Sequence, residues 1–84
     1  MERSEIVEQL TGIFRDELND KSLTLTPELS AADVPQWDSA SHLNIVVVTE
    51  VRFGIKFRTA DLDRLQNVGE FVDLIDRKLK AKVR

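Results

Sequence analysis

Residues 37–54 read Trp-Asp-Ser-Ala-Ser-His-Leu-Asn-Ile-Val-Val-Val-Thr-Glu-Val-Arg-Phe-Gly, and this stretch decides the fold. Its aspartate, Asp38, can accept hydrogen bonds from the free amides of a first helical turn, which predicts a helix that begins at Ser39. Its last residue, Gly54, readily adopts the left-handed conformation that ends many helices. The four β-branched residues at 45–48 are also typical of a strand. The cap, the glycine and the length between them nevertheless favour a helix.

The region before this helix contains one amphipathic segment and one long connection. Apolar residues recur at helical spacing from Ile6 to Leu18, which predicts a first helix over about 4–19 with Ser4 as its N-cap. Residues 20–37 have no regular period and form a connection longer than the usual helix–helix loop. We expect the apolar side chains of this loop to anchor it on the core, namely Leu23, Leu25, Leu29, Val34 and Trp37.

Two further helices are predicted after Gly54. Thr59 can cap a short helix over 60–65, and Asn67 with Glu70 forms a capping-box pattern before a last helix over about 68–81. The predicted fold class is therefore all-α. It is a single domain over residues 1–84, a small bundle of three main helices and one short helix, with a long loop between the first two helices.

Composition excludes several kinds of functional site. The 84 residues contain no cysteine and one histidine, His42, so a disulfide, a cysteine nucleophile, a thiolate zinc site and a two-histidine metal site are excluded, and no metal is expected. A domain this small buries only about 60% of its unfolded surface, so an enzyme-sized pocket would compete with the core for the same side chains. The small size of the domain therefore argues against a free-standing enzyme.

Charge and the termini bear on partners and location. The formal net charge is −3, and we interpret the basic run Lys78–Arg84 as the end of the last helix, where cations oppose the helix dipole. The acidic balance and the lack of an aromatic stacking platform argue against nucleic-acid binding. Neither a signal peptide nor a run of about 18 apolar residues for a membrane span is present. We therefore expect a cytoplasmic protein, and a monomer.

The candidate chemistry lies at the start of the second helix. Ser39 heads that helix after a long loop, so its hydroxyl is accessible, and a phosphate ester on it would face free amides and the positive end of the helix dipole. The Asp38-Ser39 pair resembles the Asp-Ser-Leu prosthetic-group motif of acyl carrier proteins. This resemblance covers nearly the whole chain and includes Glu50, Phe53–Phe57, Thr59–Leu62 and Asn67–Ile75.

This resemblance implies a function and a cofactor. A phosphopantetheinyl transferase would move a 4′-phosphopantetheine arm from coenzyme A onto the Ser39 hydroxyl, and the thiol of the arm would hold an acyl group as a thioester. The imported sulfur is consistent with a chain that has no cysteine. The carrier would catalyse nothing itself. It would deliver its cargo to acyl-loading and acyl-processing enzymes, a synthase or an acyltransferase, in a dedicated lipid, fatty acid or polyketide-type pathway.

Two departures from the family pattern concern the binding of partners. Ala40 stands where the motif usually has leucine, and residues 38–57 are formally neutral where carriers of bacterial fatty acid synthesis have a strongly acidic helix. One stripe at helical spacing contains no charge and consists of Ala40, Asn44, Val47 and Val51. We expect this uncharged stripe to bind partner enzymes mainly through apolar contact.

Several alternatives stay open at the level of single residues. Ser39, His42 and Asp38 could be imagined as a hydrolytic triad, but the segment has no strand–turn–helix elbow and no glycines for an oxyanion hole. His42 is expected to be a solvated surface residue near the arm. Trp37 is expected to anchor the loop rather than to stack on cargo.

Two alternatives concern the whole chain. One is a peptidyl or aryl carrier of a nonribosomal-peptide-type pathway, which would use the same arm for a different cargo. The other is a small helical adaptor without a prosthetic group, which would bind a partner helix through the face that contains Val47 and Val51.

Overall fold

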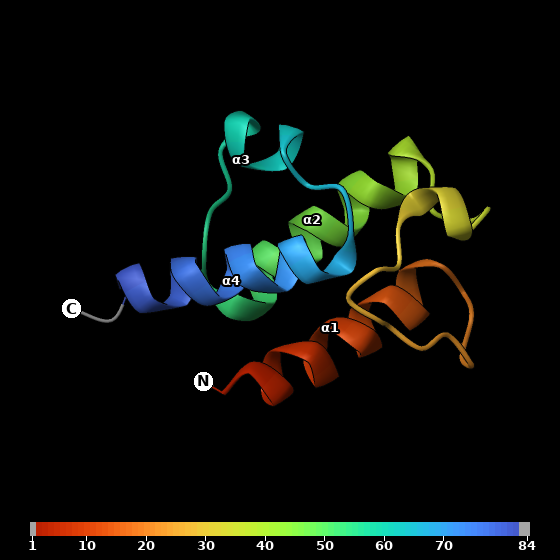
Figure 1. Cartoon of the computed structure of the whole chain (residues 1–84), viewed down its shortest axis with the longest axis horizontal. Helices are drawn as coiled ribbons and strands as arrows, with labels where there is room; N and C mark the ends of the chain where they lie inside the picture. The colour runs from red at the N-terminus through yellow and green to blue at the C-terminus, as the bar shows by residue number, and fades with distance from the viewer. Residues whose placement is uncertain (1, 83–84) are drawn as a thin grey trace.

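The computed structural model describes residues 2–82, and within them every regular element is a helix. In chain order the elements are α1 (Arg3–Glu17), the one-turn 3-10 helix η1 (Ala31–Asp33), α2 (Ser39–Phe53), α3 (Thr59–Asp63) and α4 (Val68–Lys82). The predicted all-α bundle of three main helices and one short helix is confirmed, and η1 is an addition within the long loop. Figure 1 shows α3 set apart at one edge of the molecule.

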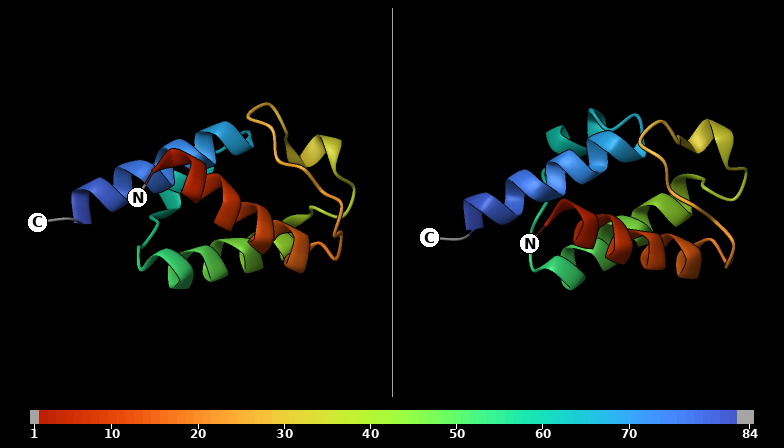
Figure 2. Two further views of the ribbon diagram at one scale, coloured as in Figure 1. Left: turned by 90° about the horizontal axis from the view of Figure 1, so that it is seen from below. Right: turned by 60° about the horizontal axis from the view of Figure 1, so that its bottom comes forward.

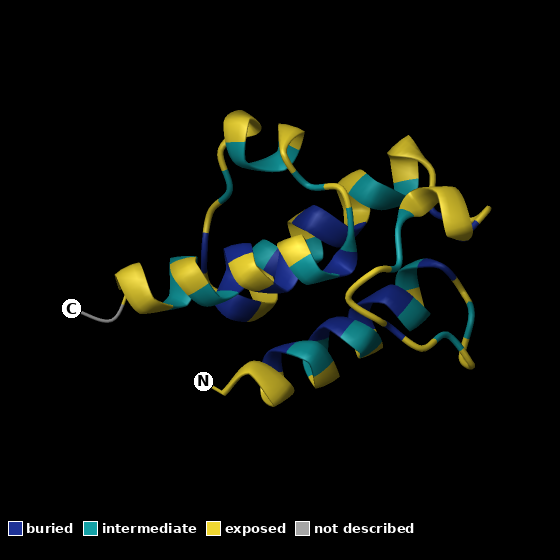
Figure 3. Cartoon of the chain, in the orientation of Figure 1, coloured by how far each residue is buried: buried dark blue, intermediate teal, exposed yellow. Residues whose placement is uncertain are grey.

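The core forms where α1 packs against both α2 and α4 (Figure 2). The buried stripe of α1 faces these two helices, and the outer faces of all three are exposed (Figure 3). Phe14 lies at the centre and is fully buried. Its ring meets that of Trp37 edge to face at a centroid distance of 4.9 Å and that of Phe71 at 6.3 Å. These contacts join α1, the long loop and α4.

The ends of α2 follow from its own sequence. Asp38 Oδ1 accepts a hydrogen bond from the Ser41 backbone N–H at 3.0 Å, and Ser41 Oγ accepts one from the Asp38 backbone N–H at 2.9 Å. This reciprocal pair satisfies amides that the helix itself cannot. At the other end Gly54 has φ 66°, a left-handed conformation that is strained for other residues. The predicted start and stop are confirmed.

Two predicted caps are wrong. Ser4 lies inside α1, because the Glu5 and Ile6 amides donate to the Glu2 carbonyl and close the first turn two residues earlier than expected. Thr59 likewise lies inside α3, which ends at Asp63 and not at residue 65. The N-cap of α3 is Arg58, whose backbone N–H donates to Asp61 Oδ2 at 2.9 Å. In both cases a backbone group, rather than a hydroxyl, decides where the helix begins.

The long loop is anchored as predicted. Leu25, Val34 and Trp37 are buried, and Leu23 and Leu29 pack partly buried against the core. The loop is also bonded to the start of α4. There the Val68 amide donates to the Leu29 carbonyl and the Gly69 amide to the Pro27 carbonyl, both at 2.9 Å. A β-carbon at Gly69 would lie 3.1 Å from that Pro27 oxygen, so glycine permits this close approach.

The capping of α4 differs slightly from the predicted box. Asn67 Oδ1 accepts from the Glu70 amide at 2.9 Å, as expected, but Glu70 Oε1 accepts from the Gln66 amide at 2.7 Å, one residue before the cap. Lys78 of α4 pairs with Asp61 of α3 at 2.9 Å. The helix continues to Lys82, while Val83 and Arg84 of the basic run lie outside the described residues. Within residues 2–82, no helix combines the length and apolar character that crossing a membrane requires.

Candidate functional site

Ser39 is the first residue of α2 and is exposed. Among the described residues its hydroxyl makes no hydrogen bond, in contrast to that of Ser41 two residues later. The long loop, which is anchored through Trp37, brings the chain to this point, and the cap then fixes the direction of the helix. The hydroxyl is thus held at a helix N-terminus, where the dipole favours an anion, and it is open to another protein.

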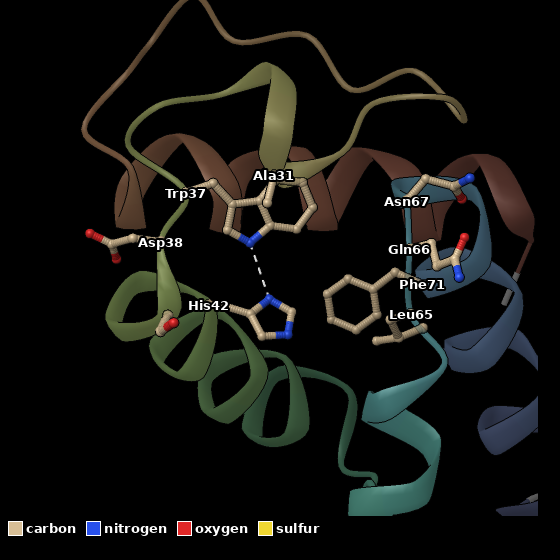
Figure 4. A pocket seen from close by; sticks show the side chains of 9 residues that line it. Ala31, Trp37, Asp38, His42, Leu65, Gln66, Asn67 and Phe71 are labelled. Atoms are coloured by element: carbon tan, nitrogen blue, oxygen red, sulfur yellow. Dashed lines mark hydrogen bonds between the residues drawn. The ribbon is translucent and has the colours of Figure 1, made fainter.

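Asp38 is held beside Ser39 by the capping hydrogen bonds. The pKa of its carboxyl is lowered, first because the Ser41 backbone N–H donates to it and then because the Ser41 hydroxyl does. The Asp38 carboxylate points away from the neighbouring cavity (Figure 4). This residue therefore shapes the turn that presents Ser39 and is an anion at neutral pH.

A cavity of about 360 Å³ opens directly beside Ser39. It lies between the start of α2, the η1 segment and the connection from α3 to α4 (Figure 4). Its walls are Ala31, Trp37, Asp38, Ser39, His42, Leu65, Gln66, Asn67 and Phe71. This volume is at the lower end of small-molecule pockets, and the sequence did not indicate it because residues 65–71 are distant in the chain.

His42 is not the solvated residue that the sequence predicts. It is half-buried, and its Nδ1 accepts a hydrogen bond at 3.1 Å from Nε1–H of Trp37 (Figure 4). Burial lowers the pKa of His42. The correction has a tertiary cause, because the indole that anchors the loop on Phe14 also covers one edge of the imidazole ring.

The hydrogen bonds of His42 and Asp38 argue against the hydrolytic triad, and the burial of Trp37 defines the role of that residue. The imidazole Nδ1 is engaged by Trp37 and the Asp38 carboxylate by Ser41, so Asp38 does not orient His42 as a triad would require. Trp37 is buried against the core, which confirms it as an anchor. Within residues 2–82, no group of three or more potential metal ligands occurs.

The uncharged stripe of α2 faces outward. Ala40 and Asn44 are exposed, and Val47 and Val51 are 55% and 79% exposed. Leu43, which is not among the residues of the predicted stripe, is 59% exposed. Its spacing, four residues before Val47, was the signal that could have placed it there. The exposed apolar surface thus continues from the turn of Ser39 to the far end of the helix.

No family model matches this chain. Several individual proteins are similar to it. The acyl carrier protein of Thermotoga maritima is 31% identical over 77 residues, which are 92% of this chain and 95% of that protein. The solution structure of holo acyl carrier protein from Geobacter metallireducens superposes with a TM-score of 0.87 at 47% identity, over 92% of this chain and 88% of that one. The chain belongs to the acyl carrier protein family.

A third relative is matched over only part of its own length. The meromycolate extension acyl carrier protein of Mycobacterium leprae is 38% identical over 74 residues, which are 88% of this chain but only 58% of that protein. The match to the Geobacter carrier confirms the fold class, and the family expected from the Asp38-Ser39 segment and the pattern after it is confirmed as well.

Proposed function

We propose that this acyl carrier protein holds acyl groups as thioesters on a 4′-phosphopantetheine arm attached to Ser39 and delivers them to partner enzymes. The observation that carries the proposal is the exposed, unbonded hydroxyl of Ser39 at a capped helix N-terminus, beside a cavity. The family membership and the holo state named for the Geobacter carrier support the prosthetic group. The arm, once bound, supplies the thiol that the chain itself lacks.

The residues around Ser39 fit such a group. A phosphate ester on Oγ would lie at the N-terminal turn of α2, where the dipole stabilises an exposed anion by about 0.3–1 kcal/mol. The capping bonds hold the neighbouring Asp38 carboxylate on the side away from the cavity (Figure 4). The cavity wall beside Ser39 includes Trp37, Leu65 and Phe71, which can contact the less polar parts of an arm or its cargo.

Attachment requires one exchange of bonds at phosphorus. The Ser39 oxygen bonds to the phosphorus that carries pantetheine, the pyrophosphate bond of coenzyme A breaks, and the adenine nucleotide leaves. The hydroxyl proton passes to a base supplied by the transferase. The role of this chain is to present the nucleophilic oxygen in a fixed orientation, which the Asp38–Ser41 cap does.

The uncharged stripe, extended by Leu43, is the proposed surface for partner enzymes. These are the phosphopantetheinyl transferase and the enzymes that load and process the acyl group. Exposed apolar side chains on one helix face, next to the attachment site, favour docking by apolar contact with little electrostatic steering. We also propose that residues 1–84 form a single carrier domain and that the protein is a cytoplasmic monomer. It would serve a dedicated lipid, fatty acid or polyketide-type pathway.

The test is modification in vitro. The chain is incubated with coenzyme A and broad-specificity phosphopantetheinyl transferases, and its intact mass is measured. We expect one added phosphopantetheine in the wild type, none in Ser39→Ala and one in the control Ser4→Ala, whose serine is also exposed. Circular dichroism shows whether each variant is folded. An unchanged wild-type mass with several active transferases would refute the proposal and favour the helical adaptor.

A further inference from the structure

The imidazole of His42 lines the cavity beside Ser39, and the neighbouring indole of Trp37 determines its tautomer. Trp37 Nε1–H can only donate a hydrogen bond, so His42 Nδ1, at 3.1 Å, must be the acceptor and cannot carry a proton. The proton of the neutral ring is therefore on Nε2. Burial lowers the pKa of His42, which favours this neutral form at neutral pH.

The position of Nε2 makes it available to a guest in the cavity. His42 lines the cavity, and its Nε2 points away from Trp37 on the side of Leu65 (Figure 4). Within residues 2–82 this nitrogen makes no hydrogen bond. Ser39 and His42 are three residues apart on one helix, so their β-carbons are about 5–6 Å from each other. A fixed N–H donor thus lines the same cavity as the attachment residue, together with the apolar side chains of Leu65 and Phe71.

We propose that His42 Nε2–H donates a hydrogen bond to a carbonyl or hydroxyl oxygen of the group attached at Ser39, and so selects for cargo that places an oxygen in this cavity. Trp37 is the positioning residue, because it holds the ring in the tautomer that donates. The inference rests on the proposed function, since it requires an arm on Ser39. It adds a residue that discriminates between cargoes of similar size.

The first experiment measures the tautomer in the protein before any arm is attached. Nitrogen-15 NMR of labelled histidine distinguishes a protonated Nε2 from a protonated Nδ1. We expect protonated Nε2 in the wild type and a mixture of both forms in Trp37→Phe, which keeps an aromatic ring but has no N–H. A protonated Nδ1 in the wild type would overturn the inference, whatever happens at Ser39.

The second experiment identifies the oxygen. The Nε2 resonance is followed in four species: the holo form, and arms that carry an S-hexyl, a hexanoyl or a 3-hydroxyhexanoyl group. A shift that first occurs with hexanoyl supports the thioester carbonyl, and a shift only with 3-hydroxyhexanoyl supports the cargo hydroxyl. A shift already complete in the holo form would assign the bond to the arm and overturn the selection for cargo. An unchanged resonance in all four species contradicts the proposal.

The third experiment measures selection. Cargo held in the cavity is shielded from hydroxylamine, so the cleavage rates of the hexanoyl and 3-hydroxyhexanoyl thioesters report how much of each is sheltered. One neutral hydrogen bond corresponds to about a fivefold difference in sheltering. We expect His42→Leu to lower the protection of any cargo whose oxygen is bonded by about this factor and His42→Gln, which keeps an acceptor and a donor, to retain it. Equal protection in the wild type and both variants would refute the role of His42.

A failure of the proposed function is separable from a failure of this inference. If no transferase modifies Ser39, the mass measurement shows it at once, and the tautomer in the unmodified protein still decides whether His42 presents a donor. If His42→Leu does not fold, the resonance shifts in the wild type decide the matter without that variant.

Discussion

Replacing the two exposed valines of α2 tests how this carrier binds its partners. Val47 and Val51 are 55% and 79% exposed, and each change to alanine removes two carbons from that surface. At about 0.8 kcal/mol per buried CH₂, complete coverage of both exposed portions by a partner contributes about 2 kcal/mol. The double variant Val47→Ala/Val51→Ala should therefore bind about 30-fold more weakly.

The same change should leave the carrier folded. Alanine has a higher helix propensity than valine by about 0.5 kcal/mol per residue. This gain offsets the loss of the portions of the two side chains that are buried within the bundle. Urea denaturation of the double variant should thus give a free energy of unfolding close to that of the wild type, which separates a docking effect from a folding effect.

The assay is kcat/KM for phosphopantetheine transfer at limiting carrier, with Arg52→Ala as a matched control. Arg52 is exposed and adjacent to Val51, but it carries charge. We expect the double variant to lose about 30-fold and the control to lose little. Raising the ionic strength from about 0.01 M to 1 M shortens the Debye length from roughly 30 Å to 3 Å and should change the wild-type rate only slightly. A steep loss with salt, or a larger effect of Arg52→Ala than of the double variant, would refute apolar docking.

Three further predictions concern the contribution of Trp37, Glu50 and His42 to the stability of the fold. Trp37→Phe should lower the free energy of unfolding by about 1–3 kcal/mol in urea denaturation, because it removes the hydrogen bond to His42 and part of a buried ring; an unchanged midpoint would mean that the bond contributes nothing. Glu50→Ala should cost about 1–3 kcal/mol, because Glu50 Oε2 accepts from the Phe57 amide at 2.8 Å and holds the segment after α2; Glu50→Gln, which keeps an acceptor, should lose less, and equal losses would argue against the bond. Because burial lowers the pKa of His42 below its ordinary value near 6.5, the unfolded chain binds more protons, so stability should fall as the pH drops below about 6.5. Comparing urea midpoints above and below that pH should show this loss in the wild type and not in His42→Gln, while the same slope in both would assign it elsewhere. Asp38 also lines the cavity, but its carboxylate points away from it, and the pKa of that carboxyl is lowered from a value already far below 6.5.

The parts of the site that could be predicted depend on local hydrogen bonds. The Asp38 cap and the Gly54 stop each involve residues a few positions apart, so the sequence suffices to place α2 and to put Ser39 at its head. The caps at Ser4 and Thr59 were wrong for a related reason. Several residues near each helix start can satisfy the same amides, and sequence patterns do not rank them.

The amino-acid sequence by itself determined the helical bundle, the family and the serine that heads α2, because helix periodicity and capping are properties of short segments. Only the tertiary structure decided the surroundings of that serine. Phe71 of α4 and Leu65 before it close the cavity, and Phe14 of α1 fixes the indole of Trp37. The same indole covers part of the His42 ring, so this histidine is half-buried and not the solvated surface residue that the sequence predicts. Its burial could not be predicted, because it depends on which distant segments pack together.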